Sequence, residues 1–426
     1  MVPDRSEKHI LSINLRMRTS GTRSTLTCLI CPANNLWNVT KKPQTGTKRP
    51  EQPLHDAFKL FDPDFEDTND TVIIIDEIQE SSEIFNRIRE FTRYFQAHFI
   101  VTGSYLGRVL EPEFKFSSGD ITSIRIYTLS FKEFLEALDD QLFQKYLSLP
   151  LDHADDTVPE LYDELKNVYD IYRQIGGYPK VVETYLNTKD VEAAQKELVR
   201  IIRIFLNESM RYFDDITDIS VFTNIFLSIC RILLREKKGL DEDSISEELQ
   251  KLVTKNYSSN LSKATCYRAI NWLYHSGIIG FCGKITELDI LNFKPGSRCF
   301  FMDLGVAYYY LSRTGATVST MDGSLNENYV YINLSKRQEF PEEIIFETPA
   351  FATYKGGEID FVAQTLKTHI RYLIEVKAGK GTASTALKAL EQGKANKLLY
   401  LKGDTKGGTV GNVQTLPIYL LEQYHF

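Results

Sequence analysis

Few folds accommodate the run at positions 72–75, four consecutive β-branched residues that end in Asp76 and Glu77. Such a run favours a strand, and an unbroken apolar run is typical of a strand buried on both faces of a sheet. Helical spacing follows over Ser82–Tyr94, and a second short apolar run lies at Phe99–Val101. Because strand, helix and strand alternate, we expect right-handed crossovers and a doubly wound parallel α/β sheet.

The rest of the 426 residues changes character several times. The beginning is rich in Thr, Lys, Arg, Asn and Pro and has no sustained apolar period, so we expect order to begin near Asp56. Three successive helices and a hairpin later in the chain are the pattern of a winged helix. The predicted segments are 1–55, irregular; 56–138, a partial α/β core with Ser123–Leu129 as its third strand; 139–215, a helical lid or linker; 216–312, winged-helix-like; and 313–426, a second α/β domain.

An Asp-Glu pair at the tip of a buried strand is typical of P-loop ATPases. In that chemistry Asp76 holds Mg²⁺ and Glu77 orients the water that attacks the terminal phosphate. Ser104 follows the next strand, where such enzymes place a polar sensor of that phosphate. The alternative is structural, because any strand end that meets solvent can carry Asp and Glu.

The phosphate-binding loop that should accompany this pair is absent from the sequence. Such a loop reads G-x-x-x-x-G-K-[ST], and its backbone N–H groups and lysine supply the phosphate contacts. The nearest fragments, Gly21–Thr25 and Gly46–Arg49, do not have this spacing. Strong ATP binding therefore does not follow from Asp76 and Glu77, and we expect it to be impaired.

A second group of chemical residues lies near the C-terminus. Asp360, Glu375 and Lys377 form the D-x(14)-E-x-K string of PD-(D/E)xK nucleases, in which two carboxylates hold Mg²⁺ and the lysine assists attack on a phosphodiester. Glu327 on the preceding helix is a candidate accessory carboxylate, and Gln392 on the following helix a candidate neighbour.

Strand parity predicts that the three residues of this string converge. Asp360 alternates with Ile359 and Phe361, and Glu375 and Lys377 alternate with apolar neighbours in the same way, so all three should lie on one face at a solvated end of a hairpin. The alternative is a surface hairpin with a cross-strand Glu–Lys pair that contributes only a few tenths of a kcal/mol (roughly).

Charge and cysteine content limit the class of protein. With 50 basic and 57 acidic residues the net charge of −7 excludes a uniformly basic nucleic-acid coat, although a local basic groove remains open. No stretch approaches the roughly 18 apolar residues of a membrane span. Six cysteines in so long a chain do not suggest a disulfide framework, and the lone pair Cys28 and Cys31 has no second pair at zinc spacing. We therefore expect a reduced, cytoplasmic protein without a membrane partner.

Several segments carry a resemblance to a known family. They are TVIIIDEIQESSEIFNRIREFTR, FIVTGSYLGRVL, YTLSFKEFL, GGYPKVV, FFMDLGVAYYYL and GGEIDFVA with YLIEVKAG, spread over residues 56–426. The chain resembles a large bacterial and archaeal family of AAA-type ATPases in which an N-terminal P-loop domain precedes a C-terminal domain of unknown function with a nuclease-like fold. The chain departs from that family in the missing phosphate loop, and residues before Asp56 look foreign to it.

The resemblance implies a fold and a set of roles. The implied fold is α/β, with a partial AAA-like doubly wound domain, a helical and winged-helix middle, and a restriction-endonuclease-like C-terminal domain. The implied cofactor is ATP with Mg²⁺, with Asp76 and Glu77 on the magnesium side, Ser104 as sensor and Arg108 as a charge-stabilising arginine at the nucleotide. A further Mg²⁺ at the C-terminal site, DNA there, and a protein partner or a second copy are the other expected partners.

Two functions from different classes remain open. The first is an ATPase-type switch, impaired in this chain, coupled to a nuclease-like region that acts on or binds DNA. The second is a non-enzymatic interaction protein in which both sites are relics.

Overall fold

The computed structural model describes residues 27–40, 52–103, 114, 119, 121–211, 213, 219–235, 244–256, 262–337, 346, 348–377 and 383–426. They divide into two compact units, the first holding the described residues up to Ile121 and the second those from Thr122 onward. No helix in the described part of the chain is both long and apolar enough to cross a membrane.

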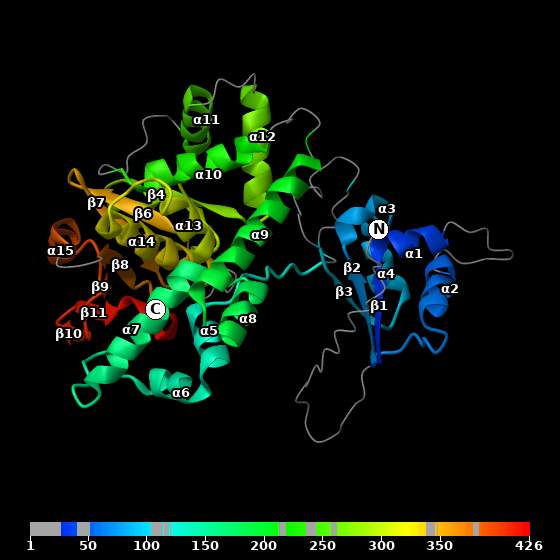
Figure 1. Cartoon of the computed structure of the whole chain (residues 1–426), viewed down its shortest axis with the longest axis horizontal. Helices are drawn as coiled ribbons and strands as arrows, with labels where there is room; N and C mark the ends of the chain where they lie inside the picture. The colour runs from blue at the N-terminus through cyan, green and yellow to red at the C-terminus, as the bar shows by residue number, and fades with distance from the viewer. Residues whose placement is uncertain are drawn as a thin grey trace. The chain divides into compact units, whose positions relative to one another are not determined.

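The first unit is a parallel sheet with helices, coloured blue to cyan in Figure 1. Its strands follow the order β1-β2-β3, and β2 is buried along its length except at Asp76, as the apolar run predicted. The strands are β1 Thr27–Pro32, β2 Thr71–Asp76 and β3 His98–Val101; the helices are α1 Ala33–Thr40, α2 Gln52–Phe61, α3 Ser82–Phe85 and α4 Ile88–Tyr94, with a 3-10 turn at Ile78–Glu80.

Two expectations for this unit are wrong. Order does not begin near Asp56, because β1 pairs along its whole length with β2 and α1 and α2 follow it. The strand escaped prediction because it is short, and its core contribution comes from Leu29 and Cys31, while Ile30 between them is exposed. Ser123–Leu129 forms no strand in the described structure; Ile124 and Ile126 are 82% and 92% exposed, so its alternation reflects no buried face.

The second unit combines a helical layer with a mixed sheet (Figure 1). The described strands follow the order β10-β11-β9-β8-β7-β6-β4-β5. The helices are α5 Phe131–Leu138, α6 Asp140–Ser148, α7 Pro159–Ile175, α8 Pro179–Thr188, α9 Val191–Arg211, α10 Ser220–Leu233, α11 Ile245–Asn256, α12 Lys263–His275, α13 Leu304–Leu311, α14 Val318–Arg337 and α15 Ser384–Glu391. The strands are β4 Ile279–Ile285, β5 Phe293–Phe301, β6 Ala350–Tyr354, β7 Gly357–Gln364, β8 Arg371–Lys377, β9 Lys397–Lys402, β10 Gly408–Val410 and β11 Val413–Pro417. Short 3-10 helices occupy Thr286–Leu288, Ile290–Asn292 and Ile418–Gln423.

The predicted hairpin is present but does not belong to a separate wing. Strands β4 and β5 pair antiparallel, and β4 also pairs in parallel with β6, which joins the hairpin to the C-terminal sheet. Helices α10, α11 and α12 match the three predicted helices. The predicted boundary near residue 312 therefore crosses a continuous sheet, because strand pairing is set by backbone geometry that sequence periodicity does not reveal.

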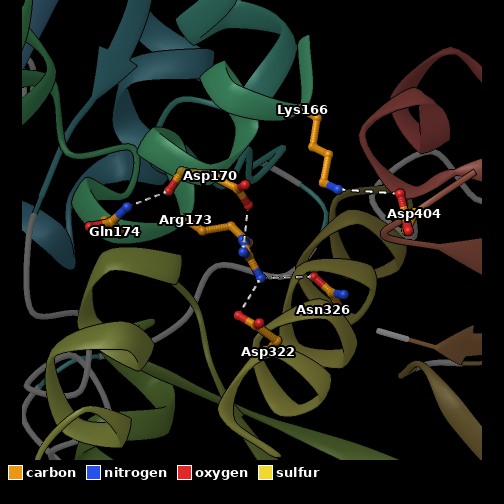
Figure 2. Close-up of polar contacts among 7 residues, drawn as sticks. All are labelled: Lys166, Asp170, Arg173, Gln174, Asp322, Asn326 and Asp404. Carbon is orange, nitrogen blue, oxygen red and sulfur yellow. Dashed lines mark hydrogen bonds and ion pairs between the residues drawn. The ribbon is translucent and has the colours of Figure 1, made fainter. Parts of the chain in front are cut away.

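Helix α14 lies across this sheet and contacts β5 and β8 (Figure 1). Figure 2 shows how Arg173 of α7 holds the first half of α14. The guanidinium contacts Asp322 at 3.0 Å and Asn326 at 3.4 Å, both on α14, and it also pairs with Asp170 on its own helix. The Arg173 side chain is only 14% exposed, so this cluster is a stronger tie than a solvated ion pair.

The segments GGYPKVV and FFMDLGVAYYYL meet at one buried carboxylate. Asp303 caps α13 and accepts a hydrogen bond from the Val306 N–H at 3.1 Å. Its other oxygen accepts from the Gly177 N–H at 2.9 Å, and the Gly177 carbonyl accepts from Leu129 N–H at 2.8 Å. Three stretches distant in sequence are thus joined at Asp303, which gives these segments a structural role.

Candidate functional site

Asp76 and Glu77 lie where β2 ends, at the carboxyl edge of the parallel sheet. The Asp76 carboxylate accepts hydrogen bonds from the Thr102 hydroxyl and, at 3.0 Å, from the Glu77 N–H. The backbones of the neighbouring strand ends are tied as well, since Thr102 N–H donates to Ile75 and Ile78 N–H donates to Thr102, both at 2.9 Å. This edge holds a carboxylate in a fixed and exposed position, which suits a hydrated cation.

Glu77 has a backbone conformation that a non-glycine residue rarely adopts. Its φ is 53° and its ψ is 49°, the left-handed region. Strain of this kind persists only where the surrounding structure holds it, and it gathers at functional positions. The turn directs Glu77 to Gln79, whose amide donates to the carboxylate at 2.5 Å.

The other residues predicted for this site have different outcomes. Ser104 and Arg108 lie outside the described residues. Thr102, which sequence reasoning missed, is the residue that contacts Asp76. The signal was available, because Thr102 is the first polar residue after the apolar run of β3.

The neighbouring strand offers no phosphate cradle at this edge. β1 ends at Pro32, opposite Asp76 in register, and α1 begins at the next residue. A glycine-rich loop needs several residues between strand and helix to wrap its N–H groups around phosphates. The β1–α1 connection leaves no space for one.

Asp360, Glu375 and Lys377 come together on β7 and β8, as strand parity predicted. These strands are antiparallel neighbours with Phe361 opposite Ile374. The Lys377 ammonium is 2.7 Å from a Glu375 oxygen and 3.2 Å from an Asp360 oxygen. The same Asp360 oxygen accepts the Val376 N–H at 2.8 Å, which ties the carboxylate to the neighbouring strand.

The expectation of a solvated strand end is wrong. Glu375 is 3% exposed and Asp360 8% exposed, while Lys377 is partly exposed. Both faces of β7 and β8 are covered, and α14 packs against β8. Strand parity therefore predicted correctly that the three side chains lie together. It did not predict that they are buried, because alternation along a strand does not reveal which helix covers the polar face.

Burial changes the protonation chemistry of this cluster. Burial first, and then the charge of Asp360, raise the pKa of Glu375 to about 7. Burial acts to lower the pKa of Lys377, but the charges of Asp360 and Glu375 outweigh it and raise that pKa. The cluster thus holds two carboxyl groups and one cation, with a proton that leaves near neutral pH.

Glu327 and Gln392 are the other residues predicted for this site. Among the described residues no three His, Cys, Asp or Glu side chains are grouped so as to hold a metal ion, so Glu327 as a third ligand is not seen. Glu327 is buried on α14, and its charge acts on the Cys282 thiol. The Gln392 side chain accepts from Tyr354 and, at 2.7 Å, from Lys355 at the β6–β7 turn.

An arginine that the sequence did not single out lies beside the cluster's strand. Arg298 on β5 is 1% exposed and forms an ion pair with Glu358, two residues before Asp360 on β7. Its guanidinium carbon lies 3.7 Å from the centre of the Phe351 ring. Glu358 lies on the same strand as Asp360, so this pairing neutralises a carboxylate two residues from the site.

Replacing Glu375 by Gln should change how stability depends on pH. The pKa is about 7 in the folded state and 4.5 in the reference state, so the native state holds the proton more tightly. Stability is then greatest below about pH 4.5 and falls as pH rises to about 7. The Glu375→Gln variant has no such proton to lose. Its free energy of unfolding, compared with that of wild type, should therefore rise by about 1–3 kcal/mol between pH 5 and pH 8. Urea unfolding at several pH values measures the effect. The exposed Glu391→Gln is the matched control and should leave the slope unchanged.

Comparisons with known proteins cover parts of the chain. A family model described as an AAA domain matches residues 34–135, and a domain of unknown function matches residues 167–317. Asp360, Glu375 and Lys377 lie outside both matched ranges. No curated protein matches the chain. Among solved structures, the Aeropyrum pernix ORC1 protein in complex with DNA matches with 14% identity and a TM-score of 0.25, covering 71% of this chain and 78% of that one. Residues 34–135 are therefore similar to an AAA domain, which supports an AAA-type ATPase in this part of the chain.

Proposed function

We propose that this protein combines an AAA-type nucleotide-switch domain, impaired in this chain by the missing phosphate loop, with a second unit that carries a divalent-cation site acting on the phosphodiester bonds of DNA. The observation that carries the proposal is the convergence of Asp360, Glu375 and Lys377, with the pKa of Glu375 near 7. We place the protein in the cytoplasm, on the cysteine content given above.

The two carboxylates fit a divalent cation. They are buried and close enough that the charge of Asp360 raises the pKa of Glu375, a repulsion that a bound cation relieves. Oxygen ligands of this kind suit Mg²⁺ and Mn²⁺. When bound, such a cation polarises a phosphoryl oxygen. Asp360 and Glu375 would hold it, Val376 N–H fixes the orientation of Asp360, and the Lys377 ammonium offers positive charge to a phosphate oxygen.

A Mn²⁺ titration at pH 8 tests this site. We expect binding by wild type, about 100-fold weaker binding by Glu375→Gln, and wild-type binding by the control Glu391→Gln. Affinity should also fall below about pH 7, where Glu375 is protonated. Equal binding by all three proteins would reject the site. If binding is confirmed, cleavage of plasmid DNA by wild type and by Lys377→Met then tests the reaction itself.

Nucleotide binding by the AAA domain should be weak. The family in general uses a nucleotide with Mg²⁺, but here β1 runs directly into α1 and Asp76 and Glu77 offer the phosphates only negative charge. Calorimetric titration with Mg-ATP should therefore give a Kd weaker than about 1 mM. Micromolar binding that is lost in Asp76→Ala would show that another segment supplies the phosphate contacts.

A non-enzymatic interaction protein is the second candidate. It is favoured by the Lys377 ammonium, which contacts both carboxylates and occupies the place that a cation would take. In that case the cluster is an internal ion pair that stabilises the sheet. Glu375→Gln would then alter stability, while Mn²⁺ would bind neither protein.

A further inference from the structure

Two lysines end neighbouring strands at the Asp360 cluster, which consists of Asp360, Glu375 and Lys377. Strands β8 and β9 run parallel, with Lys377 opposite Lys402 and Glu375 opposite Tyr400. The Gly403 N–H donates to the Lys377 carbonyl at 3.2 Å, so the two strands stay together beyond their last pair. Lys402 therefore lies one strand away from Lys377, with the two backbones about 4.8 Å apart.

Tyr400 and Lys402 lie on the same face of the sheet as the cluster. Residues opposite each other in register point to the same side, and alternation along β9 places Tyr400 and Lys402 together. The Tyr400 ring is buried. Burial, the largest influence, raises the pKa of Tyr400, and the charges of the cluster act on it as well. This influence agrees with the register and places Tyr400 beside the cluster.

The Lys402 ammonium has no described carboxylate as a partner. It lies 4.3 Å from the centre of the Tyr400 ring, and no described residue forms a hydrogen bond or an ion pair with it. Lys377 differs, because its ammonium is held between Glu375 at 2.7 Å and Asp360 at 3.2 Å. A ring face holds an ammonium in place without satisfying its N–H donors. The Lys402 side chain is partly exposed, so these donors can contact a ligand in solvent.

The acidic residue nearest to Lys402 along the sequence has another partner. Asp404 accepts from the Lys166 ammonium of α7 at 3.4 Å, as Figure 2 shows. The positive charge of Lys402 is therefore not balanced at short range by a described carboxylate, whereas that of Lys377 is. A lysine in this state, beside a candidate phosphodiester site, suits a phosphate, which lysine binds as a point charge.

We propose that Lys402 binds the DNA phosphate next to the phosphodiester at the Asp360 cluster, and that the Tyr400 ring positions its ammonium for this contact. The inference rests on the proposed function, because it takes DNA as the ligand of the second unit. Successive phosphates of one DNA strand lie only about 3.4 Å apart along the helix axis, so two neighbouring strand ends can contact two of them. Lys402 then sets how tightly DNA is held and takes no part in the chemical step.

DNA binding without a divalent cation tests this contact separately from the cation site. Fluorescence anisotropy of a labelled short duplex in EDTA, at several salt concentrations, measures the affinity of the full chain. Wild type should bind with a Kd of about 10⁻⁴ to 10⁻⁶ M. Lys402→Gln should bind about five- to tenfold more weakly at about 0.1 M salt, and the slope of log K against log salt concentration should fall by about 1. A wild-type Kd weaker than about 1 mM would overturn the inference.

Lys397→Gln is the matched control. Lys397 is the first residue of β9 and Lys402 the last, and an odd separation places them on opposite faces. The Lys397 ammonium also lies over a ring, 5.5 Å from the centre of Tyr372, so the variant removes the same charge from a similar contact. Lys397→Gln should bind DNA as wild type does, and so should Lys402→Arg, which keeps the charge. Equal losses in Lys397→Gln and Lys402→Gln would overturn the inference.

Failure of this inference can be told apart from failure of the proposed function. Lys402→Gln should bind Mn²⁺ as wild type does, because Lys402 holds no cation, and this result also shows that the variant is folded. If wild type binds no Mn²⁺, the cation site is rejected, while a loss of DNA affinity in Lys402→Gln still supports the phosphate contact. If Mn²⁺ binds and Lys402→Gln binds DNA as wild type does, the inference fails and the cation site stands.

Discussion

Gly177→Ala is expected to lower the free energy of unfolding by more than about 3 kcal/mol, while Gly323→Ala raises it by about 0.5–1 kcal/mol. A methyl group on Gly177 would lie 2.0 Å from the Leu129 carbonyl oxygen and 2.8 Å from the Leu129 nitrogen. These are backbone atoms, and the Leu129 N–H itself donates to the Gly177 carbonyl, so neither segment can move without breaking that bond.

Gly323 provides the matched comparison. It lies within α14, and a methyl group built on it meets nothing within 4 Å among the described residues. Alanine there only reduces the backbone entropy of the unfolded state and improves helix propensity. Urea unfolding of both variants measures the difference. Similar midpoints for the two would mean that the Gly177 turn adjusts freely and that close approach to Leu129 is not needed.

The sequence was enough to predict most helices and strands, but not which strands pair with one another. The run at 72–75 predicted β2 because its apolar residues are continuous, and Gly176 and Pro179 stand where α7 ends and α8 begins. β1 escaped because only alternate residues of a six-residue strand enter the core. The pairing of β4 with β6 escaped because it joins residues about 70 positions apart, with no local signal.

The sequence predicted which side chains of the candidate site lie together, but not that they are buried. Alternation along β7 and β8 placed Asp360, Glu375 and Lys377 together, since a one-residue shift would have reversed every side chain. The burial of Glu375 depends on tertiary packing over β8, and that burial, followed by the charge of Asp360, raises its pKa to about 7. Spacing alone therefore identified a candidate site but not the protonation state on which its chemistry depends.

Asp303, the cap of α13, lies at the same junction as Gly177 and contacts it directly. Asp303 is 3% exposed, and burial, the largest influence, raises its pKa. Its carboxylate accepts hydrogen bonds from the backbone N–H groups of Gly177 and Val306. The side chain thus replaces water as the acceptor for two buried donors at once.

Asp303→Ala should lower the free energy of unfolding by about 3–5 kcal/mol, because each buried N–H left without an acceptor costs about 1–3 kcal/mol. Asp303→Asn is the matched variant: its carbonyl oxygen can still accept from one set of donors, while its amide faces the other, so its loss should be about half as large. Equilibrium denaturation of both, with hydrogen exchange at Gly177 and Val306, measures the effect and its location. A loss below about 1 kcal/mol for Asp303→Ala would mean that water satisfies these donors. We expect Asp303→Ala to lose more stability than Asp303→Asn, and hydrogen exchange to become faster first at Gly177. Both results follow only if the carboxylate itself holds α7 and α13 together.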